Sequence, residues 1–577
     1  MQDIKWSEII KRNKQLSLKM KGPVKKVALL SNSSNFQLKE ILELKLRELG
    51  ISIEIDLGDY DLILQDSAHF KNHDAVIIFW ELSNLIDGLY YKYNSLNEKK
   101  LDSLIDKVES EIKLTLSNLK ETPLVLINEF SSMIFDANVL EQSKLCLLSN
   151  RLNNFIKNTT LQNQLVVNIE KIIAVTGLGQ AIDYRQLQSS KSLYTKDFYL
   201  NYVEYIKPAF LASNGMVKKV LVLDCDNTLW GGILGEDGED KIQMNDLSNK
   251  GKSFHEVQHL IKGYKQKGIL LALCSKNNLA DVDNILDNHK DMILKKDDFV
   301  SKRVNWTDKA QNLIDLSNEL NLGLDSFIFI DDSEFEIGLI QRELPQIKSV
   351  LVPKDLSTYP DLIRSLERDL FSFSFTKEDS DKTSMYIEES KRKETQKNFK
   401  SIDDYLESLG LNMQVVFNHE VSIQRAAQMT QKTNQFNLRT QRYTESEIQN
   451  FIESDNHIVS TFSLADMHGE YGVTGLCIIN IEDDIAFIDT FLMSCRVIGR
   501  NAELSFFAQI IKKLRTIRDK ELILEAEWIY SPKNNQVIKF YDGLGFKCTM
   551  EASESKVYRL SLSEFKANQK DYIKILV

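Results

Sequence analysis

Two aspartates, separated by one residue, follow a short apolar run near the middle of the chain. In "VLVLDCDNT" the apolar residues end at Leu223, and Asp224 and Asp226 come next. Other polar residues follow later apolar runs: Ser275 after "ILLALC", and Asp331 with Asp332 after "SFIFI". Ligands of open α/β sheets bind beyond the carboxyl ends of the strands. We therefore expect these side chains to face one site.

Carboxylates that converge on one edge repel one another and need a cation. A set of oxygen ligands favours Mg²⁺, which keeps several waters and carries substrate phosphate. Asp224 is placed to attack phosphorus as a nucleophile, and Asp226 to transfer a proton. Ser275 and Lys309 supply partners for phosphoryl oxygens. The residues thus predict Mg²⁺-dependent phosphoryl chemistry, and the alternative is that each acid caps a helix or turn.

The order DxDxT, Ser, Lys and DD resembles the four motifs of the haloacid dehalogenase (HAD) superfamily. More narrowly, "LDCDNTLWGGILGEDG" and "NWTDKAQNLIDLSNELNLGLDSFIFIDD" are similar to the FkbH-like family. Its members include glyceryl transferases that load a three-carbon unit from 1,3-bisphosphoglycerate onto an acyl carrier protein. Further similarity lies in "KTNQFNLRTQRYTE" and "FIDTFLMSCRVIGRNAE", so the resemblance covers well over half of the chain.

The resemblance implies a role for each motif residue. Asp224 is the nucleophile, Asp226 the acid/base and Thr228 a supporting group, while Ser275 and Lys309 bind phosphate. The implied Mg²⁺ ligands are Asp224, Asp226, Asp331 and Asp332. The chain departs from the family after the second acidic pair, where Ser333 and Glu334 replace a common Asn-Pro and Ile337 replaces an Arg. The implied metal ligands are unaffected.

Three blocks of secondary structure are expected to position these residues. The first two alternate apolar strand-like runs with amphipathic helices, which is typical of α/β domains. Neither interval between the strands of the second block is long enough for a cap domain. The predicted fold is α/β with three domains: an SGNH-like doubly wound domain (1–214), a capless HAD-like domain (215–370) and, after a charged helical linker (371–400), a GNAT-like α+β domain (401–577).

Two motifs in the third block are similar to the GNAT acetyltransferase fold. "SCRVIGRNAE" resembles its acyl-CoA loop, although Asn501 replaces the final small residue, and "NNQVIKFYDGLGF" resembles its closing helix and strand. Such loops hold pyrophosphate at a helix N-terminus. The resemblance implies CoA or phosphopantetheine as a ligand and a binding set of Arg496, Gly499, Arg500 and Asn534. His468 and Glu470 are candidates for a general base, but we expect them to form a polar turn instead.

The first block resembles the SGNH-hydrolase fold without that fold's catalytic residues. Ser31, Ser33 and Ser34 lack a Gly-Asp-Ser setting, and no His lies three residues after Asp197. Without a base to activate a serine, this block is predicted to be a scaffold or a recognition domain.

Composition narrows the class of protein. The 577 residues carry a net charge of −11, which argues against nucleic acid or an anionic membrane as the main partner. The six cysteines are scattered without a CxxC pair, which is typical of reduced thiols. No signal peptide or apolar membrane span is evident, so a cytoplasmic location is predicted.

The leading prediction is a Mg²⁺-dependent enzyme acting on a phosphorylated small molecule, with glyceryl transfer to an acyl carrier protein as its most concrete form. One alternative is a phosphomonoesterase. Another is a carrier-protein or acyl-CoA binding module, or an N-acyltransferase, with a vestigial phosphatase site. Cys225, between the two acids, is expected to pack beneath the sheet, and the alternative is a thiol that carries the acyl group near Lys276 or Lys309.

Overall fold

The computed structural model describes residues 4–20, 23–136, 142–373, 385–386, 388, 401–467, 469–517, 522–566 and 569–576. The chain forms two compact units, Met1–Ser213 and Asn214–Val577. The predicted boundary after residue 214 lies next to this division. Most of the predicted linker (371–400) falls outside the described residues.

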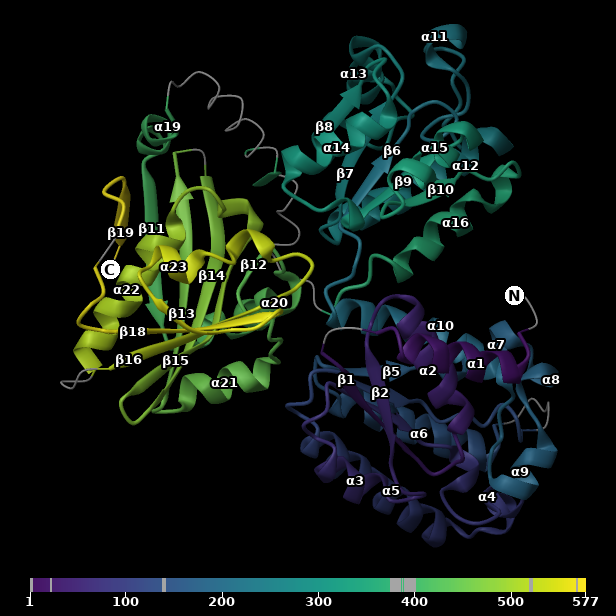
Figure 1. Cartoon of the computed structure of the whole chain (residues 1–577). Coiled ribbons are helices and arrows are strands. Elements are labelled where there is room, and N and C mark those ends of the chain that lie inside the picture. The colour runs from purple at the N-terminus through teal and green to yellow at the C-terminus, as the bar shows by residue number, and fades with distance from the viewer. Residues whose placement is uncertain are drawn as a thin grey trace. The chain divides into compact units, whose positions relative to one another are not determined.

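The first unit is built on a parallel sheet of order β2-β1-β3-β4-β5. All five residues of the central strand β3 (Ala75–Phe79) are buried, because helices cover both faces (Figure 1). The other strands are β1 (Lys25–Ser31), β2 (Ile53–Leu57), β4 (Val125–Asn128) and β5 (Gln164–Val167). The helices pack as two groups, namely α1 (Trp6–Ser17), α2 (Phe36–Glu48), α7 (Ile169–Thr176) and α10 (Lys196–Ser213), and α3 (Ile63–His69), α5 (Glu98–Asn118) and α6 (Lys144–Thr159).

The second unit begins with a parallel sheet of order β10-β9-β6-β7-β8. From β6 the chain adds strands on one side and then returns to add β9 and β10 on the other, so a topological switch point lies between β6 and β9. Leu223, at the end of β6, is level with Leu273 and Ile330 of its neighbours. The strands are β6 (Val220–Leu223), β7 (Leu270–Ser275), β8 (Phe299–Val304), β9 (Phe327–Asp331) and β10 (Lys348–Leu351).

Helices on both faces of this sheet enclose two hydrophobic cores. Val222 of β6 lies in the core that holds Leu313 and Ile340, whereas Leu223 lies in the core that holds Val257 and Ile285. The helices are α11 (Leu234–Asp237), α12 (Asn249–Gln266), α13 (Leu279–Asn288), α14 (Lys309–Leu320), α15 (Glu334–Glu343) and α16 (Tyr359–Ser365). Only α11 and α12 lie between β6 and β7, and only one α-helix, α13, between β7 and β8, so the described residues 214–370 include no cap domain.

The rest of the second unit is a mixed sheet of order β17-β18-β16-β15-β14-β13-β11-β19, with β12 paired to β15. Its strands are β11 (Leu411–Phe417), β12 (Phe436–Asn437), β13 (His457–Asp466), β14 (Gly469–Glu482), β15 (Ile485–Met493), β16 (Ile523–Ile529), β17 (Lys547–Glu551), β18 (Ser555–Ser561) and β19 (Ile573–Leu576). The helices are α19 (Ile402–Ser408), α20 (Ile423–Lys432), α21 (Glu445–Glu453), α22 (Ala502–Ile517) and α23 (Phe540–Gly543). This is the α+β architecture predicted for the third block.

Among the described residues, none of the helices is both long and apolar enough to cross a membrane.

Candidate active site

Three predicted carboxylates meet at the carboxyl edge of the β6–β9 pair. Asp224 directly follows β6, and its backbone N–H donates to the carbonyl oxygen of Ile330 at 3.0 Å. This bond fixes Asp224 beside Asp331, the last residue of β9. Carboxylate oxygens of Asp224, Asp331 and Asp332 all lie within 4.8 Å of one another. Asp224 and Asp331 are buried, whereas Asp332 is exposed.

Lys309 joins two of these acids. It is the first residue of α14, whose N-cap Asp308 accepts hydrogen bonds from the backbone of Ala310 and Gln311. The Lys309 ammonium Nζ lies 2.6 Å from Asp331 Oδ2 and 3.2 Å from Asp224 Oδ1. Its side chain is only 4% exposed, so its charge is directed at the two carboxylates.

Burial and mutual repulsion disfavour the ionised acids. Burial raises the pKa of Asp224 to about 6; Lys309 opposes this rise and Asp331 adds to it. Burial, followed by the charge of Asp331, also raises the pKa of Asp332. For Lys309, burial acts to lower the pKa, but Asp224 and Asp331 outweigh it and the pKa is raised. The site is therefore a cationic lysine within an excess of negative charge.

The donor set fits a small divalent cation. All candidate ligands are carboxylate oxygens, the type that Mg²⁺ prefers. Asp224 Oδ1 is buried and accepts no hydrogen bond in the described structure, although it lies near the Lys309 ammonium. A buried carboxylate oxygen without a donor is costly, and a cation would relieve that cost. Asp224, Asp331 and Asp332 are the residues that would hold it.

Asp226 is not a member of this group of carboxylates. Its Oδ1 accepts hydrogen bonds from Trp230 Nε1 at 2.9 Å and from the Leu234 backbone at 3.0 Å. Its Oδ2 accepts from Asn277 Nδ2 at 2.9 Å. The structure thus brings Asp226 to the same edge but holds both its oxygens with protein donors, and its roles as an acid/base and as a metal ligand stay predictions.

Ser275 is connected to Asp226 through a residue that sequence reasoning missed. Ser275 ends β7 and is buried, and Asn277 Nδ2 lies 3.3 Å from its Oγ. Asn227, also missed, has a φ of 51° and accepts a hydrogen bond from the Gly232 backbone at 3.0 Å. Position in the sequence was the available signal, since Asn277 lies two residues after the end of β7 and Asn227 lies four residues after the end of β6.

Cys225 lies in the core beneath the sheet. Its side chain is fully buried in the cluster that contains Leu223, Trp230 and Phe254. Burial, and next the neighbouring Asp224 carboxylate, raise the thiol pKa well above its usual range. A neutral, enclosed thiol is a poor nucleophile. These surroundings favour packing over the alternative of an acyl-carrying cysteine.

The predicted cofactor-binding residues of the third block make internal contacts. Arg500 is buried, donates to the Arg496 carbonyl oxygen at 2.8 Å and lies over the ring of Tyr471. Asn534 is fully buried and donates to the carbonyl oxygens of Asn437 and Ile529. Gly499 has a φ of 86°, which suits glycine in this turn. Asn534 is therefore a crosslink between segments rather than a ligand-facing residue.

Two further features surround this loop. The parallel pairing of β15 with β16 ends at Ile488 and Ala526. Beyond it, β12 pairs with Leu492 and Met493, the last two residues of β15. Ile529 of β16 in turn donates to the carbonyl oxygen of Leu438. Glu503 lies in the first turn of α22, and burial raises its pKa. An acid there competes with an anion for the helix N-terminus.

His468, considered as part of a general base, lies outside the described residues.

The serines of the first unit are held in a polar cluster. Ser31 Oγ donates to the Phe79 carbonyl oxygen at 2.8 Å and accepts from Asn35 Nδ2 at 2.7 Å. Ser33 is buried, whereas Ser34 is exposed. The non-catalytic role of this unit stays a prediction.

Comparison with solved structures supports the fold. The N-terminal part of the protein BF1531 from Bacteroides fragilis, which contains a phosphatase domain and is complexed with Mg, is 25% identical with a TM-score of 0.55. That match covers 64% of this chain and 100% of the other. The ribosomal-protein-S18-alanine N-acetyltransferase from Escherichia coli is 14% identical with a TM-score of 0.21, over 27% of this chain and 99% of the other. No protein-family model and no curated protein matches the chain.

Proposed function

We propose that this chain is a Mg²⁺-dependent enzyme that acts on a phosphorylated small molecule through Asp224. The observation that carries the proposal is the cluster of Asp224, Asp331 and Asp332 with the buried ammonium of Lys309. The likeness to a phosphatase domain complexed with Mg supports it. A bound Mg²⁺ would supply charge stabilisation for the phosphoryl oxygens.

The nucleophile, its positioning residue and the acid/base are all side chains of this chain. An Asp224 carboxylate oxygen attacks phosphorus, the bond from phosphorus to the leaving oxygen breaks, and an aspartyl-phosphate forms. Lys309 holds Asp224 in place through its contact at 3.2 Å. Asp226, fixed by Trp230 and Asn277, is positioned to give a proton to the leaving oxygen and to take one from the attacking water.

The most concrete form of the proposal is transfer of glyceryl from 1,3-bisphosphoglycerate to an acyl carrier protein with loss of phosphate. The thiol of the carrier's phosphopantetheine loses its proton and attacks the acyl carbon, the bond from that carbon to the acyl-phosphate oxygen breaks, and phosphate departs with the proton. The remaining phosphate ester is removed by attack of Asp224 on its phosphorus, and water then releases the phosphoryl group from Asp224, so that the products are a glyceryl thioester and two phosphates. The sequence resemblance supports this form. The absence of a cap among described residues 214–370 suits a large acceptor. The surroundings of Cys225 favour direct transfer to the carrier, without an enzyme thioester.

A phosphomonoesterase is the second candidate, because hydrolysis needs an acid/base, and Asp226, held by Asn277 at the same edge of the sheet, is the residue proposed for it. A vestigial site is disfavoured, since the buried acids and Lys309 remain although they are costly to bury.

Phosphate release from a panel of phosphorylated metabolites tests the proposal. The panel includes 1,3-bisphosphoglycerate with and without a phosphopantetheinylated carrier protein, in Mg²⁺ and in EDTA. Release that requires Mg²⁺ and is lost in Asp224→Asn supports the enzyme, and dependence on the carrier selects glyceryl transfer. Release that persists in Asp224→Asn removes the proposed chemistry.

A further inference from the structure

Lys276 is a second ammonium group at the candidate active site, and solvent reaches it. It directly follows Ser275 at the end of β7, and its side chain is 39% exposed. The side chain of Lys309 is only 4% exposed and is engaged with Asp224 and Asp331. The two lysines therefore differ in what they can offer to a molecule that arrives from solution.

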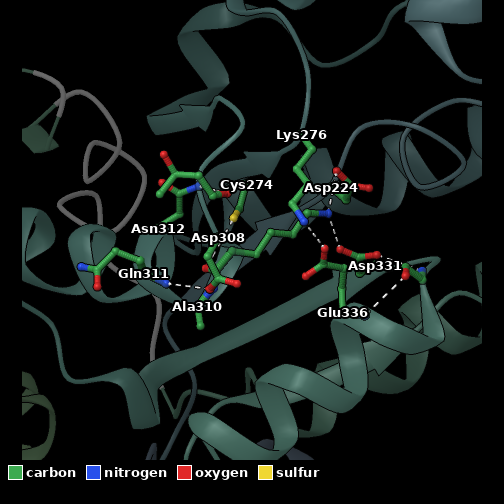
Figure 2. Close-up of polar contacts among 12 residues, drawn as sticks. Asp224, Cys274, Lys276, Asp308, Ala310, Gln311, Asn312, Asp331 and Glu336 are labelled. Carbon is green, nitrogen blue, oxygen red and sulfur yellow. Dashed lines mark hydrogen bonds and ion pairs between the residues drawn. The ribbon is translucent and has the colours of Figure 1, made fainter.

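The contact that Lys276 makes places it across the site. Its Nζ lies 2.6 Å from Oε1 of Glu336, in the first turn of α15. Helix α15 follows β9, and β6 lies between β7 and β9 in the sheet. Lys276 and Glu336 therefore follow the two strands that flank β6, and Asp224 directly follows β6. Figure 2 draws the Lys276–Glu336 pair together with Asp224 and Asp331.

Glu336 is buried without full compensation. It is 6% exposed, and its second oxygen, Oε2, has no hydrogen-bond partner in the described structure. A buried carboxylate held by one half-exposed lysine contributes little to stability, because desolvation offsets the attraction. The same helix carries an ordinary exposed pair, Glu334 with Lys354 at 2.9 Å, whose side chains are 67% and 90% exposed. Packing alone does not explain why the Lys276 pair is placed at the site.

We propose that Lys276 binds the outer oxygens of the substrate's phosphoryl group, exchanging its contact with Glu336 for one with the substrate. This inference rests on the proposed function and adds a substrate-binding residue to it. Glu336 holds the Lys276 ammonium until an anion competes for it. Hydrogen bonds from a charged donor are the strong class of such contacts, so loss of Lys276 should be visible in anion affinity.

The test compares Lys276→Met, Lys276→Arg and the matched control Lys354→Met, which breaks the exposed pair on the same helix. Inorganic phosphate is titrated into the full chain in saturating Mg²⁺ by calorimetry, and Mg²⁺ is titrated separately. We expect Lys276→Met to weaken phosphate binding roughly 10- to 100-fold. Lys276→Arg should restore most of this loss, and Lys354→Met should match wild type. Mg²⁺ affinity should change little in all three. The melting temperature should fall in Lys276→Met, which leaves the buried Glu336 carboxylate without its cation, so phosphate is titrated well below that temperature.

Phosphate binding in Lys276→Met within twofold of the Lys354→Met control would overturn the inference, and so would a loss that Lys276→Arg does not restore. The proposed function is judged separately, by Mg²⁺-dependent phosphate release from wild type. Wild type that releases phosphate while Lys276→Met binds it normally removes only this inference. Wild type that binds phosphate through Lys276 without turnover removes only the proposed function.

Discussion

Replacing Asp224 by Asn should stabilise the metal-free protein at pH 7 while it removes activity. Burial raises the Asp224 pKa from its ordinary value of 3.8 to about 6, so the ionised form is disfavoured in the fold. A difference of roughly two units corresponds to about 3 kcal/mol. Asparagine is nearly isosteric and stays neutral, so it should relieve an energy of this order.

The stability difference between Asp224→Asn and wild type should depend on pH. Between pH 4 and 6 the unfolded chain loses the Asp224 proton while the folded chain keeps it, so folding stability falls as the pH rises through this window. At pH 4, close to the ordinary pKa of 3.8, the folded chain and a little under half of the unfolded chains hold the proton, so the variant should exceed wild type by less than about 1 kcal/mol. At pH 7 the full difference of about 3 kcal/mol is expected. For the predicted domain 215–370 this corresponds to a melting temperature about 6 °C or more above that of wild type.

The assay is differential scanning calorimetry of the metal-free protein at pH 4 and pH 7. The unfolding transition that shifts when Mg²⁺ is added identifies the domain that holds Asp224. Mg²⁺ at about a thousand times the dissociation constant should reverse the order, because wild type then gains about 4.1 kcal/mol, which exceeds the stabilisation of about 3 kcal/mol in the variant. Asp287→Asn, which alters an exposed carboxylate on α13, is the matched control and should change stability by about 0.5 kcal/mol or less. A metal-free Asp224→Asn that melts at or below wild type at pH 7, or a gap that is equal at both pH values, would refute the reasoning.

Three further outcomes are expected. In a phosphate-release assay, Asp224→Asn should lose several orders of magnitude in rate, because an amide is neither nucleophile nor good ligand; a tenth of wild-type activity would remove Asp224 from the mechanism. Cys225→Ala should keep phosphate release, and intact mass spectrometry of wild type with 1,3-bisphosphoglycerate should show no thioester; an adduct that vanishes in the variant would assign the thiol a chemical role. Glu503→Gln should strengthen coenzyme A binding about fivefold in titration calorimetry, because it removes negative charge from the first turn of α22. Equal or weaker binding would show that this helix end does not face the pyrophosphate.

The sequence alone determined the strands of the catalytic sheet and the acids at their ends. Runs such as Leu270–Ser275 and Phe327–Asp331 are apolar up to their last residue because helices cover both faces of the sheet, and this pattern is local in the sequence. Asp224 and Asp331 meet because parallel strands end at one edge, which follows from strand order and needs no knowledge of side-chain positions. The structure brings the carboxylates of Asp224, Asp331 and Asp332 together, and their role as metal ligands stays a prediction.

Only the tertiary structure decided what each side chain contacts. Asp226 is drawn to Trp230, Leu234 and Asn277, which lie 4, 8 and 51 positions along the chain, and such partners depend on how the loops fold over the sheet. The reach of Lys276 to Glu336 depends on β6 lying between β7 and β9. Burial likewise sets the chemistry of Cys225 and Asp224, since desolvation is the first cause of both raised pKa values. A sequence pattern records which groups stand at strand ends, but desolvation and long-range contacts arise only when the strands, helices and loops have packed together.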